Sequence, residues 1–284
     1  SELIRTTMKE NRLKANNAAI VLPSEAVYVK NVSMPQMTVD QLVYNLPFEF
    51  NDYITGEIKD YVFDYAVLQD EEDEGQEDLP ETEWGETSGK KLSLMAVGTQ
   101  RSVLEDAQAI LRKAGLRMKI AAPAICTYIS LIRAGRERLY RIAEEFGILD
   151  LGYEAIRLYM FKGDRHVATR VLEIGLSTLD DVIADVFGVD VHLAHTYLMN
   201  NYENCLEREE CINAYENIAV ELMRAMNFYR FSNPDSTLSD LWLCGGGAVI
   251  RPLKNAISDM LDMELHPAEE LVPDGGAIPD WNSF

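Results

Sequence analysis

The second half of the chain constrains the fold most strongly, because its predicted elements follow an order that few folds share. Apolar alternation and β-branched residues predict three consecutive strands between residues 145 and 174, with Lys162-Gly163-Asp164 as a hairpin turn. Helical periodicity then predicts helices between residues 178 and 229, a strand at 241–244, a helix from Arg251 and a strand at 264–266. A Rossmann unit would place a crossover helix after every strand. The observed order instead favours a ribonuclease H-like α/β fold.

The strand at 241–244 runs into three consecutive glycines, Gly245, Gly246 and Gly247. Without Cβ atoms such a turn can adopt positive φ and let a ligand approach the backbone, while the N-terminus of the following helix favours anions. A tight turn that only packs a strand against a helix explains the glycines equally well.

Composition excludes some function classes. The chain has 284 residues and a formal net charge of −21, which argues against a nucleic-acid surface or direct binding to an anionic membrane. No apolar run reaches the roughly 20 residues that a membrane span needs. The four cysteines are scattered without CxxC spacing, so reduced thiols in a cytoplasmic protein are expected.

The predicted elements of the first half repeat the last part of the order seen in the second half, without its three opening strands. Strands are predicted at 18–22, 26–32, 61–68, 92–97 and 118–121. Thr38-x-x-Gln41 predicts a capping box, which opens a helix that Pro47 should kink or break. Residues 70–90 are rich in Asp, Glu, Gly and Ser and read as a solvated loop; they lack the Asp/Gly spacing of a calcium loop.

Several short motifs, in this order and at this spacing, resemble the family of type IV pilus assembly proteins PilM. They are Ile20-Val21-Leu22-Pro23-Ser24, Val27-x-Val29-Lys30, Phe48-Glu49-x-x-x-Tyr53-Ile54, Asp150-x-Gly152, Glu173-Ile174-Gly175, Glu221-x-x-Arg224-x-x-x-Phe228-Tyr229 and Gly245-Gly246-Gly247-Ala248. The resemblance covers nearly the whole chain. It implies the actin-like ATPase, ribonuclease H-like two-lobed fold, related to the cell-division protein FtsA, with a small α+β subdomain inserted in the first lobe.

The resemblance also implies a division of the chain. Residues 1–37 and 116–142 would form a partial first lobe, and residues 38–115, with the acidic loop 70–90, the inserted subdomain. Residues 143–284 would form the second lobe, with a helical insertion at about 188–231.

ATP with Mg²⁺ is the cofactor that the resemblance implies. The glycines 245–247 would form the adenosine loop, and Asp150 and Gly152 the second phosphate loop, where Asp150 reaches Mg²⁺ through water. Glu221 and Arg224 would face the ribose or the adenine. The alternatives are a hairpin-capping role for Asp150 and a solvated helix face for Glu221 and Arg224.

Two departures from the family pattern weaken the expected nucleotide site. Small hydroxyl residues normally follow the glycine of the second phosphate loop, but here Tyr153 and Glu154 stand there, and a carboxylate disfavours an anion. The first phosphate loop, an Asp-x-Gly turn near the N-terminus, is absent. The chain is therefore either a trimmed form or a degenerate member, with ATP expected to be missing from this form. We identify no catalytic residue, so at most a weak ATPase is expected.

His192-x-x-His195 has a spacing that could supply two metal ligands, since both histidines lie on one face of a predicted helix. No third ligand stands nearby in the sequence. These residues are interpreted as surface or packing histidines, and no protein metal ligand is predicted.

The family resemblance implies a protein partner, the short cytoplasmic N-terminal peptide of a PilN-like membrane protein. The peptide would bind a groove beside the inserted subdomain, and Val43, Leu46 and Phe50 are the candidates to line it. The alternative is that these three residues form the core of the subdomain.

The sequence thus predicts a cytoplasmic scaffold of a type IV pilus or related secretion machine. It would be held at the inner face of the cytoplasmic membrane through its partners, which include other proteins of the assembly platform. The alternatives are an active ATPase or sugar-kinase-like phosphotransferase, and an FtsA-like filament-forming protein. The oligomeric state stays open.

Overall fold

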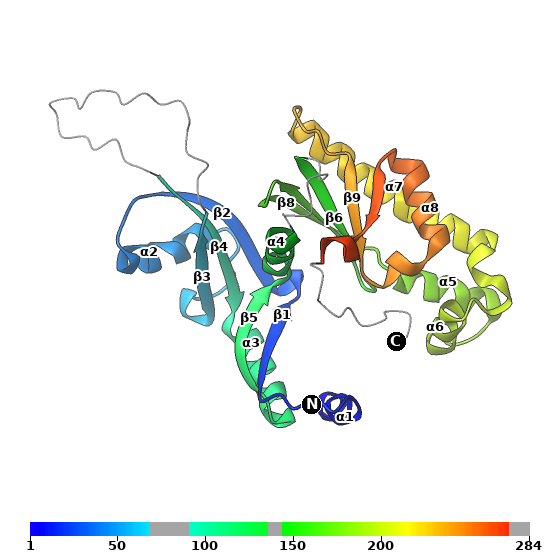
Figure 1. The fold of residues 1–284 in the computed structure, drawn as a ribbon, viewed down its shortest axis with the longest axis horizontal. Helices are drawn as coiled ribbons and strands as arrows, with labels where there is room; N and C mark the ends of the chain where they lie inside the picture. The colour runs from blue at the N-terminus through cyan, green and yellow to red at the C-terminus, as the bar shows by residue number, and fades with distance from the viewer. Residues whose placement is uncertain (69–90, 136–143, 273–284) are drawn as a thin grey trace. The chain divides into compact units, whose positions relative to one another are not determined.

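The computed structural model describes residues 1–68, 91–135 and 144–272 of the chain, so the predicted acidic loop 70–90 lies outside the described residues. The contacts between residues divide the chain into two compact units, residues 1–127 and 128–284. Each unit has its own sheets and its own hydrophobic core, and Figure 1 labels the elements of both.

The first unit contains two small sheets. Its elements are α1 (Glu2–Glu10), β1 (Asn17–Leu22), β2 (Val27–Pro35), α2 (Val39–Asn45), β3 (Tyr61–Val67), β4 (Lys91–Gln100), α3 (Arg101–Ala114), β5 (Arg117–Pro123) and the start of α4 (Ala124–Gly135). Strands β1 and β5 pair in parallel, and β2, β4 and β3 form an antiparallel sheet in that order. Strand β2 precedes residue 38 but pairs with β4 from Val27 to Pro35, so the small antiparallel sheet extends beyond the segment 38–115.

Helix α2 begins at the predicted cap and breaks before Pro47. Thr38 and Gln41 form the expected capping box, with the Thr38 side chain accepting from the Gln41 N–H and the Gln41 side chain accepting from the Thr38 N–H. The helix ends at Asn45, and a 3₁₀ turn (Leu46–Phe50) carries Pro47 in its first positions. Apolar side chains of this turn and of α2 pack on the antiparallel sheet and form the core of the subdomain.

The second unit is built on one five-stranded mixed sheet. Its elements are the rest of α4, β6 (Glu145–Leu151), β7 (Ile156–Lys162), β8 (Arg165–Leu172), α5 (Ser177–Phe187), α6 (Val191–Met199), α7 (Glu209–Ser232), β9 (Asp240–Cys244), α8 (Arg251–Leu261) and β10 (Glu264–Pro267). The strand order is β10-β9-β6-β7-β8. The three predicted meander strands pair antiparallel, whereas β9 is parallel to both β6 and β10. This order of elements is the one predicted from the sequence.

The sheet of the second unit has two different faces, because side chains alternate along a strand. Leu149, Leu151 and Leu243 point into the large core, which α5, α7 and α8 cover. Asp150 and Cys244 therefore point to the opposite face, and the register places them side by side. The candidate nucleotide residues of β6 and β9 thus meet at the carboxyl ends of two adjacent parallel strands.

Candidate functional site

The glycine-rich turn has the predicted strand–turn–helix geometry. Strand β9 ends at Cys244, Gly245 has φ +82°, a 3₁₀ turn covers Gly246–Val249, and α8 begins at Arg251. Positive φ at Gly245 is a conformation that L-residues with a side chain rarely adopt.

Two of the three glycines are required by packing inside this unit. A Cβ atom at Gly245 would lie 2.5 Å from Asp150 Oδ1, and one at Gly247 would lie 2.7 Å from Leu151 Cβ. At Gly246 a Cβ would meet nothing closer than 3.6 Å. The glycine-rich turn therefore lies directly on the end of β6. The structure brings Gly245 and Asp150 together, and Gly246 is the glycine with free space.

The loop after β6 is closed by its own backbone. A Cβ atom at Gly152 would lie 2.6 Å from the carbonyl oxygen of Ala155, so only glycine fits this tight turn. The carbonyl oxygens of Gly152 and Tyr153 accept hydrogen bonds from the N–H groups of Leu176 (3.1 Å) and Ser177 (3.0 Å). The segment before α5 thus holds the loop against the sheet.

Two carboxylates and a guanidinium lie at this loop, since Arg157 Nη1 donates to the Ala155 carbonyl oxygen at 3.3 Å. A hydrogen bond to Asp180, more than burial, raises the pKa of Tyr153, and the Asp180 side chain is completely buried. Glu154 follows in the same loop. Carboxylates at these positions repel phosphate oxygens. The two carboxylates oppose a phosphate at this loop, so Mg–ATP binding stays a prediction.

Asp150 has a cationic neighbour of its own. In the antiparallel register of β6 and β7 it lies directly opposite Arg157, and directly opposite residues share one face of a sheet. The guanidinium is a competing cation for any Mg²⁺ that Asp150 would hold through water. On the same face, burial raises the pKa of the Cys244 thiol to about 12, with Asp150 adding to the rise, and the Tyr128 hydroxyl lies 3.5 Å from that sulfur.

Glu221 and Arg224 lie on α7, where Arg224 is exposed and Glu221 partly exposed. Arg224 Nη1 donates to Glu221 Oε1, one turn away along the helix. The pair is typical of a solvated helix face, and contact with the ribose or adenine stays a prediction.

The three predicted partner-binding residues separate into two groups. Leu46 and Phe50 are buried in the core of the antiparallel sheet, with 2% and 0% of their surface exposed, whereas Val43 is 57% exposed. A partner that binds this subdomain can contact Val43 directly. Leu46 and Phe50 belong to the core below and can only support the surface that the partner contacts. The sequence could not separate them, because Pro47 changes the helical phase between Val43 and Phe50.

His195 has a partner that sequence reasoning missed. Its Nδ1 atom lies 2.9 Å from Oδ2 of the buried Asp180 on α5. His192, one turn earlier on α6, is exposed. The pair is a contact between two helices of the second unit. No sequence signal distinguishes Asp180 from its neighbour Asp181.

Among the described residues, no helix is both long and apolar enough to cross a membrane.

A family model described as type IV pilus assembly protein PilM matches residues 1–270. No curated protein matches the chain. Among solved structures, the PilM–PilN type IV pilus biogenesis complex is similar over 95% of this chain and 75% of that chain, with 23% identity and a TM-score of 0.75. The ethanolamine utilization protein EutJ from Carboxydothermus hydrogenoformans matches with 18% identity over 59% of this chain and 56% of that one, at a TM-score of 0.45. The cytoplasmic domain of EpsL, an inner membrane component of the type II secretion system of Vibrio cholerae, matches with 15% identity. That match covers 66% of this chain and 62% of that chain, at a TM-score of 0.38. The predicted actin-like fold is thereby confirmed.

Proposed function

Because the chain belongs to the PilM family of type IV pilus assembly proteins, we propose that it is a scaffold that binds the N-terminal peptide of a PilN-like membrane protein. The observation that carries the proposal is the family match over residues 1–270. The fold shared with the PilM–PilN complex supports it. On this proposal the protein is peripheral to the inner face of the cytoplasmic membrane, where its partner holds it beside other assembly proteins.

The surface of α2 and of the 3₁₀ turn after it, called the α2 surface below, offers apolar contacts for such a peptide. Val43, Tyr44 and Phe48 are 57%, 72% and 48% exposed, and the rings of Tyr44 and Phe48 lie edge to face with centroids 5.9 Å apart. Exposed aromatic side chains are costly in water and enriched in binding surfaces. Leu46 and Phe50 hold this surface in place from the core beneath it. We infer that the peptide contacts Val43 and Phe48.

We further infer that the protein is not an enzyme and that any binding of Mg–ATP is weak and serves only to favour one conformation. The buried Asp180 beneath Tyr153 and the carboxylate of Glu154 support this inference, since they oppose a phosphate at the second loop. Binding at the glycine-rich turn would have to use Gly246, where the backbone is open.

Calorimetric titration of the protein with a synthetic PilN-type N-terminal peptide tests the scaffold proposal. The expected result is saturable binding that Phe48→Ser weakens at least about tenfold, as for other aromatic interface residues. Phe231→Ser is the matched control, because Phe231 is an exposed phenylalanine of the second unit. Absence of binding by the unmodified protein would overturn the proposal. Equal loss in both variants would show that the peptide does not use the α2 surface.

A turnover assay with Mg–ATP tests the enzymatic alternative. We expect no ATP hydrolysis above a blank without protein. Turnover that Asp150→Asn abolishes would instead establish an active ATPase or phosphotransferase. Polymers in a sedimentation run would support an FtsA-like filament.

A further inference from the structure

Two carboxylates lie directly side by side at the edge of the five-stranded sheet. In the parallel register of β9 and β10, Glu264 is paired with Asp240, and both side chains point to the face away from the helical core. Like charges at directly paired strand positions are destabilising. A cation bound between the two carboxylates would offset this repulsion.

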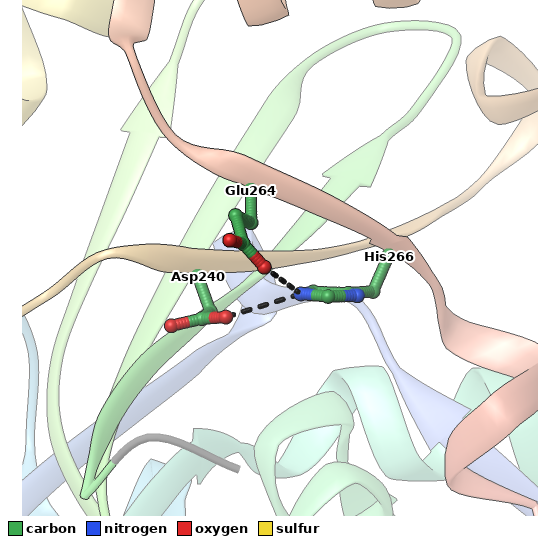
Figure 2. A group of neighbouring side chains, drawn as sticks. All are labelled: Asp240, Glu264 and His266. Carbon is green, nitrogen blue, oxygen red and sulfur yellow. Dashed lines mark hydrogen bonds and ion pairs between the residues drawn. The ribbon is translucent and has the colours of Figure 1, made fainter. Parts of the chain in front are cut away.

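The imidazole of His266 completes the group. His266 lies two residues after Glu264, so its side chain shares the same face of β10. Its Nε2 atom is 3.1 Å from Asp240 Oδ1 and 3.7 Å from Glu264 Oε2, as Figure 2 shows. The three ligand atoms all lie within 4.8 Å of one another.

These separations suit a bound metal ion. Zinc binds histidine nitrogen and carboxylate oxygen at about 2.0–2.2 Å, which puts neighbouring ligands of a tetrahedral site about 3.3 Å apart. One nitrogen and two oxygens are ligands for first-row transition ions rather than for Mg²⁺ or Ca²⁺, which prefer oxygen alone. Two carboxylates also neutralise the charge of a divalent ion.

The surroundings hold two of the ligands in place. The indole of Trp242 stacks on the His266 ring, with centroids 4.7 Å apart and planes at 28°, and Ser239 donates a hydrogen bond to the other oxygen of Asp240 at 2.5 Å. Such outer contacts orient the ligands of metal sites. Trp242 is 6% exposed, and within the described part of the chain its indole N–H has no hydrogen-bond partner. Glu264 is 80% exposed and leaves an entry path.

We propose that Asp240, Glu264 and His266 bind one divalent first-row transition-metal ion per chain, with water in the remaining positions. The ion fastens the edge strand β10 to β9. It is distinct from the predicted Mg²⁺ position at Asp150, which lies on β6 at the opposite end of the β9 register.

Titration of the EDTA-treated full chain with Zn²⁺ tests the proposal, with heat and the thermal midpoint as readouts. We expect one ion per chain and a thermal midpoint that rises with Zn²⁺ concentration. Co²⁺ as a second probe should give visible absorption bands that Zn²⁺ abolishes by displacement.

His266→Gln should weaken Zn²⁺ binding at least about tenfold, since even outer contacts of a metal site are worth that much. Glu264→Gln should also weaken Zn²⁺ binding. Its side chain is exposed, and circular dichroism checks that this variant still folds. His192→Gln, which removes an exposed histidine on α6, should leave the affinity unchanged. Unchanged binding in both ligand variants, or no stoichiometric binding, would show that His266 only forms an ion pair with the carboxylates and would overturn the proposal.

Discussion

His195 Nδ1 lies 2.9 Å from Oδ2 of Asp180, a carboxylate with no exposed surface. The contact joins α6 to α5, and the His195 ring lies edge to face with the ring of Tyr153 in the loop after β6, with centroids 5.9 Å apart. His195 thus links the buried Asp180 of α5 to the loop that the family resemblance assigns to phosphate.

Replacing His195 by Ala should destabilise the fold by about 2 kcal/mol. Removing one member of a fully buried pair costs about 3–5 kcal/mol because the other is left uncompensated, and the cost is lower here because about half of the His195 side chain is exposed. Urea unfolding measures the change. His192→Ala on the same helix is the control and should stay within about 0.5 kcal/mol of the parent protein. Equal effects of the two substitutions would contradict the pairing.

Gly247→Ala and Gly246→Ala should differ sharply. The new Cβ at position 247 would lie 2.7 Å from Leu151 Cβ and 3.0 Å from Leu176 Cδ2, which calls for a shift costing about 1–3 kcal/mol. At position 246 the nearest atom is 3.6 Å away, so the free energy of unfolding should change by no more than about 0.5 kcal/mol. Thermal unfolding of the two variants checks this, and strong destabilisation by Gly246→Ala would contradict the open space at that position.

Phe50→Ala and Val43→Ala should separate the core of the small subdomain from its surface. Phe50 is completely buried, and its truncation should cost about 3–5 kcal/mol through lost burial and a residual cavity. Val43 is mostly exposed, so its truncation should change the free energy of unfolding by no more than about 0.5 kcal/mol. Denaturant unfolding followed by circular dichroism gives both values. A similar cost for the two would mean that α2 and the turn after it pack on the sheet through a different face.

His166 should make the protein less stable in acid. Burial lowers the pKa of His166 on β8 to about 4 from an ordinary 6.5, and its Nε2 lies 2.8 Å from Thr169 Oγ1. Between these values the unfolded chain binds a proton that the folded chain does not, so stability rises with pH. The free energy of unfolding therefore keeps its full value, as far as His166 is concerned, above about pH 6.5. It falls by about 2–3 kcal/mol through this residue as the pH approaches about 4.

Urea unfolding at about pH 7 and about pH 4.5 measures this effect. His166→Gln should lose less stability between the two conditions than the parent protein, by about 2 kcal/mol. His192→Gln, which replaces an exposed histidine, should follow the parent. Carboxylates contribute equally to all three proteins, so identical pH dependence in the three would contradict the assignment to His166.

Local patterns in the sequence predicted much of the architecture. The meander of β6, β7 and β8, the capping box at Thr38 and the glycine-rich turn after β9 all depend on residues close together in the chain. The meeting of Asp150 with Gly245 was also predictable, because parallel neighbouring strands bring their carboxyl ends together. Whether these residues hold a nucleotide stays a prediction.

The order of strands, helices and turns follows from the sequence alone; that order led to the fold class, and short motifs led to the family. Tertiary packing decides which of two chemically identical side chains becomes buried. Asp180 and Asp181 are neighbours of the same type, yet only Asp180 is completely enclosed and paired with His195, because the rotation of α5 against α6 selects one face. The cluster of Asp240, Glu264 and His266 likewise exists only through the register of β9 on β10, which joins residues far apart in the chain. Periodicity describes one element at a time, whereas burial and ligand clusters depend on how two elements meet.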